Sequence, residues 1–220
     1  MKILWITLIV IALSSCASQK KLEDSFSGFI SQTHYEKLSR VESLSDQVVF
    51  RYIAPDFKPA NYTHVIVDPV IAYPEPQPTE QVSMEMLRDI QARLTRLLED
   101  SMSEALKLSQ SSGEGVLRLQ VAITGVNISD KSLAVYEYIP VAMIAAGASK
   151  AAGARDQQVR LFMEGRVVDT ETGVVQAVGI REIKGDDLEN VKAKLQAQQL
   201  NQGFKDAGED MAAVIKKIFK

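Results

Sequence analysis

The chain has 220 residues, a formal net charge of −3, and apolar residues at 46% of its positions. This length suits one domain with a tether, or at most two small domains, and the apolar share is sufficient for a hydrophobic core. A mildly acidic chain binds nucleic acid and anionic membrane surfaces poorly. We therefore expect no nucleic-acid partner and no electrostatic attachment to a membrane.

The first 15 residues have the order of a signal peptide. Lys2 supplies a positive charge, the run 3–13 is apolar, and two small serines follow it. A membrane-spanning helix needs roughly 20 apolar residues, so this run is too short to span, and no later run reaches that length. The sequence therefore predicts a signal peptide over residues 1–15, with cleavage between Ser15 and Cys16.

Cys16 is the only cysteine in the chain. Residues 13–16, Leu-Ser-Ser-Cys, resemble the lipobox of bacterial lipoproteins, in which an aliphatic residue and two small residues precede the cysteine. The resemblance implies that the Cys16 thiol receives a diacylglyceryl group and that the new amino terminus is acylated, commonly with palmitate. The alternative is an ordinary secreted protein, whose lone thiol would be exposed to oxidation and mispairing. We predict that Cys16 is a lipid anchor, in which each buried methylene contributes about 0.8 kcal/mol.

The residues after the cysteine predict which membrane holds the anchor. In enteric bacteria an aspartate at the next position retains a lipoprotein at the inner membrane, whereas Ala17 and Ser18 follow here. By resemblance to those lipoproteins, the chain is expected on the periplasmic face of the outer membrane. Residues 16–26 are predicted to be a lipid-anchored tether, and residues 27–220 a single α+β domain.

The first part of this domain is predicted to contain short elements. Residues 31–40 predict one or two helical turns, and residues 48–53 predict a short edge strand that two prolines end. Residues 64–73 are β-branched on both faces, which is typical of a buried strand. Pro69 has no N–H to donate to a neighbouring strand, so we expect this strand to be broken there.

Residues 83–108 give the clearest helical pattern. Ser83 is a suitable N-cap, and a Ser-Ser-Gly run at 111–113 ends the segment. An apolar stripe recurs every three or four residues, which is typical of a helix packed on a core. The stripe consists of Met84, Leu87, Ile90, Leu94, Leu97, Leu98, Met102, Ala105 and Leu106.

A strand and a hairpin follow the helix. Residues 116–128 alternate in the period of two that is typical of a half-buried strand. Residues 159–168 and 174–184 predict two further strands. The turn Asp169-Thr170-Glu171-Thr172-Gly173 joins them, and Gly173 supplies the positive φ that such a turn requires.

Residues 186–217 predict a second long helix, with a kink near Gly203 where the apolar stripe loses phase. The acidic pair Glu209-Asp210 fits the solvated face of this helix. The order strand, helix, strand, hairpin, helix favours an α+β fold. We expect a two-layer sandwich in which a mainly antiparallel sheet carries two long helices on one face.

Several stretches together resemble one protein family. They are the lipobox, Ser27-Gly28-Phe29, Tyr62, residues 67–70 and the turn 169–173. The chain resembles a family of Gram-negative lipoproteins of unknown function, domain-of-unknown-function family 3313, over nearly the whole mature chain. Because these motifs are structural, the resemblance bears on fold and cellular location far more than on activity.

The sequence offers no constellation of catalytic, metal-binding or cofactor-binding residues. His34 and His64 share no motif with an acid or a cysteine. The chain lacks the Gly-x-Ser-x-Gly, His-Glu-x-x-His and Walker patterns, and its only cysteine is assigned to lipid. We therefore predict a protein that is not an enzyme and that uses no metal and no cofactor.

Two features remain as candidate sites. Asp68 is an acid inside an apolar strand, so it marks either a buried polar site or a strand bulge whose carboxylate accepts backbone hydrogen bonds. Residues 136–155 are rich in small side chains. They form either a short helix packed on the sheet or a contact surface for a partner or for lipid headgroups. That surface would consist of Ala142, Met143, Ile144, Gly147 and Ala148.

Three roles are compatible with these features. The preferred hypothesis is a non-enzymatic outer-membrane lipoprotein that binds another protein of the cell envelope. The alternative is a lipoprotein that binds a small ligand or a glycan in a pocket between helices and sheet, which a tightly filled interface would contradict. A periplasmic hydrolase is the third hypothesis, and it requires His64 and Asp68 to meet a serine in a cleft.

Overall fold

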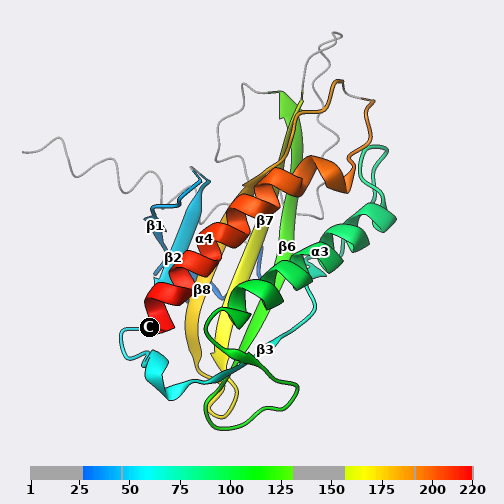
Figure 1. The fold of residues 1–220 in the computed structure, drawn as a ribbon. Coiled ribbons are helices and arrows are strands. Elements are labelled where there is room, and N and C mark those ends of the chain that lie inside the picture. Colours follow the sequence, from blue (N-terminus) through cyan, green and yellow to red (C-terminus); the bar gives the residue numbers. More distant parts are fainter. Residues whose placement is uncertain (1–26, 46, 131–156, 191, 220) are drawn as a thin grey trace, which may run out of the picture.

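The computed structural model describes residues 27–45, 47–130, 157–190 and 192–219 (Figure 1). These residues form a mixed α+β structure. None of the helices among them is long and apolar enough to cross a membrane. The elements are α2 (Gln32–Tyr35), β1 (Ser39–Val41), β2 (Val49–Ile53), the 3-10 helix η1 (Pro59–Asn61), β3 (His64–Val67), β4 (Ile71–Ala72), α3 (Met84–Ser103), β5 (Lys107–Leu108), β6 (Val116–Asp130), β7 (Gln157–Asp169), β8 (Val175–Lys184), the 3-10 helix η3 (Ala197–Leu200) and α4 (Asn201–Phe219).

The strands form one eight-stranded sheet in the order β1-β2-β8-β7-β6-β3-β5, with β4 also paired to β6. All pairs from β1 to β6 along this order are antiparallel, whereas β3 and β4 pair with β6, and β5 with β3, in parallel. The prediction of a mainly antiparallel sheet is confirmed. The expectation that residues 48–53 form an edge strand is wrong, because β1 covers the outer edge of β2.

The predicted hairpin and the predicted break at Pro69 are both present. β7 and β8 are joined through a turn in which Asp169 Oδ1 accepts hydrogen bonds from the N–H groups of Glu171 and Thr172, both at 2.9 Å. Gly173 has a φ of 72° there, a conformation that favours glycine. On the other side of β6, pairing stops after Val67 and resumes at Ile71.

The first long helix is shorter than predicted. Ser83 Oγ accepts a hydrogen bond from the Met86 N–H at 3.1 Å, which begins α3 as expected. The helix ends at Ser103 rather than near residue 108. Its predicted last turn is lost because Lys107 donates its N–H to Thr63 O at 3.0 Å and joins the sheet as β5.

The Ser83 cap leads to a stability prediction. Ser83→Ala is expected to lower the free energy of unfolding by about 1 kcal/mol, because one N–H at the helix start loses its acceptor. The measurement is urea unfolding of the unlipidated mature chain, meaning residues 16–220 with Cys16→Ser. Ser103→Ala at the exposed opposite end of α3 is the control and should change the stability by less than about 0.5 kcal/mol. Equal losses in the two variants would contradict the capping role.

The second long helix begins later than predicted. Residues 186–190 and 192–196 are not helical, although Leu188 and Leu195 are buried as their spacing suggested. Leu188 instead exchanges backbone hydrogen bonds with Gln157, and the Leu195 N–H donates to Gln81 O at 2.9 Å. These contacts with distant segments replace the intrahelical bonds, so α4 spans only Asn201–Phe219.

The helical turn predicted within residues 31–40 is present as α2, and residues 39–41 form the edge strand β1. The kink predicted near Gly203 is wrong. Gly203 lies near the start of α4, where it has a packing role. A Cβ at this position would lie 2.2 Å from Lys184 O, so only glycine lets α4 approach the end of β8 this closely.

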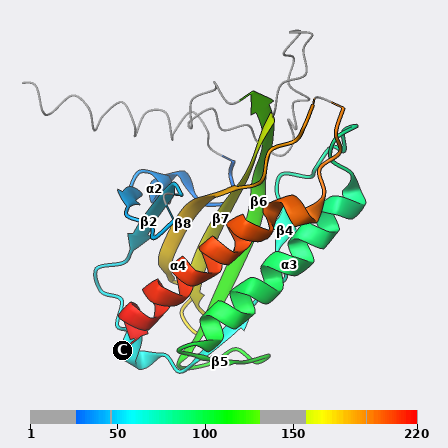
Figure 2. The same ribbon diagram turned by 45° about the horizontal axis from the view of Figure 1, so that its top comes forward.

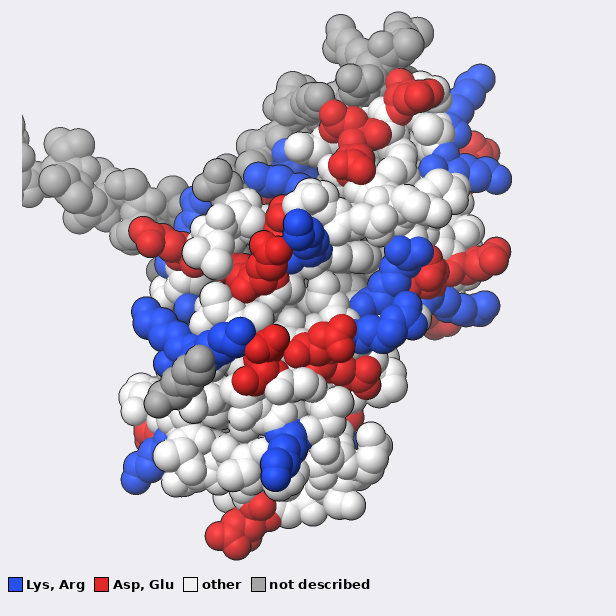
Figure 3. All heavy atoms as spheres, in the orientation of Figure 1, with Lys and Arg blue, Asp and Glu red and all other residues white. Residues whose placement is uncertain are grey.

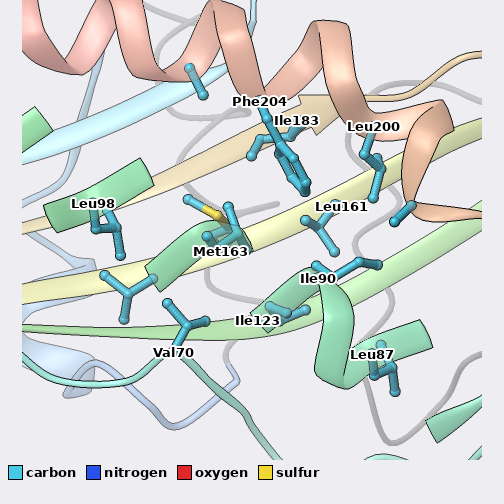
Figure 4. Packing of buried hydrophobic residues seen from close by; sticks show 14 of the residues in the cluster. Val70, Leu87, Ile90, Leu98, Ile123, Leu161, Met163, Ile183, Leu200 and Phe204 are labelled. Carbon is cyan, nitrogen blue, oxygen red and sulfur yellow. The ribbon is translucent and has the colours of Figure 1, made fainter. Parts of the chain in front are cut away.

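α3 and α4 run side by side across the sheet (Figures 1 and 2). Leu87, Ile90, Leu94 and Leu98 of α3 are at most 2% exposed and belong to one apolar cluster with β6, β7 and β8. Figure 4 shows Phe204 of α4 and Ile183 of β8 pointing toward one another in this cluster.

A second apolar cluster contains α2. Tyr35 packs there with residues of β2 and β8, including Phe50, Val178 and Ile180. Successive residues of a strand point to opposite faces, so these β8 side chains and those of Ala177 and Arg181 lie on opposite sides of the sheet. α2 and the long helices therefore contact opposite faces.

Candidate functional site

A pocket of about 210 Å³ lies between α4 and the sheet, toward the β2 and β8 side. α4 contributes Met211, Val214, Ile215, Ile218 and Phe219 to its walls, and α3 contributes Leu98 and Met102. The strand residues that line it on this face are Val49, Arg51, Ile53, Leu117, Leu119, Val121, Met163, Gly165, Val167, Ala177, Gly179 and Arg181. The walls are therefore almost wholly apolar, with charge confined to two arginines among these side chains.

The pocket exists because the sheet carries small residues beneath α4. Gly165 of β7 and Gly179 of β8 are paired directly across the two strands, and Ala177 lies two positions from Gly179 on the same face. None of the three has a side chain beyond Cβ. The space that larger strand residues would occupy under a helix therefore stays open.

The volume of the pocket limits what it can hold. At about 210 Å³ it is larger than the roughly 150 Å³ apolar cavity that stays dry and accepts benzene. It is smaller than the roughly 300–1,000 Å³ typical of pockets for drug-sized ligands. One hydrocarbon chain fits these limits better than a fused ring system or an oligosaccharide.

One residue of the pocket wall, Arg181, belongs to an ion pair. Arg181 of β8 donates to Asp210 Oδ2 of α4, and Arg181 Nη1 donates to Gln47 Oε1 at 3.2 Å. Asp210 also accepts from the Leu44 N–H at 3.1 Å and from the Ser43 hydroxyl at 3.2 Å. Burial alone would raise the pKa of Asp210, but these donors and the Arg181 charge hold it below its ordinary value.

Arg51 is the second arginine of the pocket. It lies on β2 directly opposite Gly179 of β8, so its side chain starts at the floor of the pocket. In the described part of the chain its guanidinium takes part in no ion pair or side-chain hydrogen bond. Burial lowers the pKa of Arg51, with Asp210 opposing and Arg181 adding to that effect. The group nevertheless stays cationic near neutral pH, as arginine does in proteins.

Buried acids lie on the opposite face of the sheet. Glu164 contributes to the pocket wall, but its carboxylate points the other way and accepts a hydrogen bond from the Tyr35 hydroxyl. Burial and the nearby Glu164 charge raise the pKa of Tyr35. Glu182 is 1% exposed and lies 3.5 Å from Arg160 Nε, and burial raises its pKa. These acids do not face the pocket.

Asp68, the acid singled out in the sequence, is only partly buried, with 27% of its side chain exposed. It accepts a hydrogen bond from Gln120 Nε2 at 2.9 Å and lies 3.4 Å from Arg118 Nη1. Its own N–H donates to Leu119 O at 3.0 Å, directly after the last residue of β3 that pairs with β6. Its charge is therefore compensated within the sheet.

The two histidines do not form a catalytic group with Asp68 among the described residues. His34 shares a hydrogen bond with Ser31 Oγ at 2.7 Å, and His64 with Thr63 Oγ1 at 2.8 Å. Asp68 has other partners, so the predicted grouping of His64, Asp68 and a serine is not assembled in the part of the chain that the structure describes. No group of three histidine, cysteine or acidic side chains in the described ranges could hold a metal ion.

Other predicted site residues lie outside the described residues. They are Ser15 and Cys16 at the predicted lipidation site, and Ala142, Met143, Ile144, Gly147 and Ala148 of the predicted contact surface. Their roles stay predictions, as do the limits of the signal peptide and the tether.

The residues that make the pocket were not predicted from the sequence. Asp210 was assigned to a solvated helix face, yet it is 4% exposed and paired with Arg181. The glycine pair had no local signal, because counting outward from the 169–173 turn places residue 165 opposite residue 177, and only the register shift between Val167 and Val168 pairs Gly165 with Gly179. Arg51 had none, since its neighbours beneath α4 come from distant parts of the chain.

The charge distribution on the face that carries α3 and α4 is relevant to whether that face could bind nucleic acid. Figure 3 shows basic and acidic residues interspersed over the face that carries α3 and α4. The described part of this face presents no large area of one sign. Such a surface lacks the basic stripe that nucleic-acid-binding proteins use.

Comparisons with known proteins identify the family. The model of the family described as "Protein of unknown function (DUF3313)" matches residues 25–211. The Escherichia coli K12 protein named "Uncharacterized lipoprotein YdcL" is 30% identical over 201 residues, covering 91% of this chain and 90% of that protein.

Two solved structures are similar at low sequence identity. The PelC dodecamer from Paraburkholderia phytofirmans matches with a TM-score of 0.37 and 8% identity, covering 78% of this chain and 96% of that one. A putative neuraminyllactose-binding hemagglutinin homolog from Helicobacter pylori matches with a TM-score of 0.37 and 14% identity, covering 75% and 87%. The family match and the similarity to YdcL, not these distant structures, establish that the chain belongs to the DUF3313 family of proteins of unknown function.

Proposed function

We propose that this chain is a lipoprotein of the cell envelope that binds an apolar ligand non-enzymatically beneath α4. In this proposal Cys16 carries the lipid, the anchor lies in the outer membrane, and the two-layer sandwich of sheet and long helices faces the periplasm. The name of the relative YdcL and the Leu-Ser-Ser-Cys run at 13–16 support the lipoprotein assignment.

The apolar pocket supports the binding role. A tightly filled interface between helices and sheet would have contradicted a small-ligand protein, whereas the interface here leaves about 210 Å³ open over Gly165, Gly179 and Ala177. This observation favours the ligand-binding alternative over a role confined to binding a protein partner. The small apolar volume favours a hydrocarbon chain over a glycan, which would need polar partners in the walls.

Filling the pocket is expected to weaken the binding of an apolar ligand. Ala177→Phe places a ring in the space above the sheet and should weaken binding of decan-1-ol, a neutral single-chain probe, at least tenfold. Isothermal titration calorimetry of the unlipidated mature chain measures the affinity. Binding to the wild-type sequence should show a negative heat-capacity change, the marker of apolar burial.

Ala213→Phe is the matched control, because Ala213 is exposed on α4 and does not line the pocket. It adds the same side chain and should leave decan-1-ol binding unchanged. Circular dichroism checks that both variants fold, and the smaller Ala177→Val should give an intermediate affinity. Undiminished binding to folded Ala177→Phe would refute the pocket as the binding site.

A further inference from the structure

The pocket has one electropositive end. Arg51 and Arg181 both line it, and Asp210 is the acid paired there. Both oxygens of Asp210 already accept hydrogen bonds, Oδ1 from the Leu44 N–H and Oδ2 from Arg181 and the Ser43 hydroxyl. The guanidinium charges of Arg51 and Arg181 and the carboxylate charge of Asp210 sum to a local charge of +1.

Arg51 is placed to meet a ligand. Its neighbours on the same face of β2 are Val49 and Ile53, and both line the same pocket. The residue paired with Arg51 on the neighbouring strand β8 is Gly179, which has no side chain to separate the guanidinium from the open volume. A planar guanidinium beside an apolar space is suited to hold a carboxylate through two parallel hydrogen bonds.

We propose that the ligand is an alkyl carboxylate of the fatty-acid type, with its chain beneath α4 and its carboxylate on Arg51. This inference rests on the proposed function and adds the class of ligand to it. The apolar walls bind the hydrocarbon chain, and the charge of Arg51 selects the acid over a neutral molecule of the same length.

The test compares decanoate with decan-1-ol, which have the same chain and different heads. In calorimetry at neutral pH, the unlipidated mature chain should bind decanoate about tenfold more tightly than decan-1-ol. Octanoate is two methylenes shorter and should bind about sixteenfold more weakly than decanoate, because each methylene contributes about fourfold in affinity. Arg51→Gln should remove the preference for the acid, so that the variant binds decanoate and decan-1-ol with affinities within about twofold of each other.

Arg96→Gln is the control, since Arg96 is exposed on α3 and does not line the pocket. It should leave the preference for decanoate intact. Should Arg51→Gln fail to fold, the wild-type preference can be followed with salt. It should shrink as ionic strength rises from about 0.02 to 0.5 M, because salt screens a partly exposed charge.

The outcomes separate this inference from the proposed function. Equal affinities for decanoate and decan-1-ol in the wild type would overturn the inference while leaving the pocket as a site for a neutral chain, such as an acyl group carried by Cys16. A preference that survives in folded Arg51→Gln would also overturn it. Failure of both probes to bind the wild type would overturn the proposed function and the inference with it.

Discussion

Gly203→Ala is expected to lower the free energy of unfolding by about 3 kcal/mol or more, although alanine is the better helix former. The added Cβ would lie 2.2 Å from Lys184 O and 2.6 Å from Ile183 Cγ2. The first of these atoms belongs to the backbone of β8, so it cannot turn aside as the end of a side chain can. Overpacking a close contact commonly costs about 1–3 kcal/mol, and a backbone clash belongs at the upper end of that range.

Gly208→Ala provides a matched control on the same helix. A Cβ there would meet only Leu97, at 3.5 Å, which is an ordinary van der Waals distance. This variant should be neutral or more stable by up to about 1 kcal/mol, because glycine in a helix interior is less favourable than alanine by that amount. Urea unfolding of both variants of the unlipidated mature chain checks the difference. Similar stabilities for the two would mean that α4 does not rest on the end of β8.

Local sequence signals were sufficient where an element depends on its own residues. Ser83 and the apolar stripe after it predicted α3, and the Asp169–Gly173 turn predicted the β7–β8 hairpin, because caps and turns are made by neighbours in the chain. The same reasoning failed for residues 186–190 and 192–196. Leu188 and Leu195 have helical spacing, but each is held by a backbone partner far away in sequence, Gln157 and Gln81.

The candidate site could not be predicted from local sequence signals for the same reason. An open volume depends on which residues face each other across two layers, and the spacing of residues along one element does not reveal it. Gly165 and Gly179 become a pocket floor only because α4 passes above them. From its position next to Glu209, Asp210 is likewise predicted to be exposed. It is buried because α4 packs on the sheet at Arg181.

Asp210→Asn is expected to lower the free energy of unfolding by about 3 kcal/mol near neutral pH. Removing one partner of a buried ion pair leaves the other charge uncompensated, which costs about 3–5 kcal/mol in comparable cases. Here Arg181 would remain beneath α4, with Gln47 as its other hydrogen-bond partner. Asp206→Asn, four residues earlier on α4 at a half-buried position where the carboxylate accepts a hydrogen bond from Gln202 at 2.7 Å, makes the same chemical change and should alter the stability by less than about 0.5 kcal/mol.

The effect of Asp210→Asn should depend on pH in a defined direction. The donors around Asp210 hold its pKa in the folded state below the ordinary value, so the folded state binds a proton less readily than the unfolded state does. The stabilisation is therefore fully present above the unfolded pKa of about 3.9, and it is lost as pH falls through the lower folded pKa. Urea unfolding at several pH values should show the wild type and Asp210→Asn differing most near pH 7 and converging below about pH 4. A difference that persists undiminished in acid would mean that the variant loses packing or hydrogen-bond geometry, and that the charge of Asp210 does not hold α4 on the sheet.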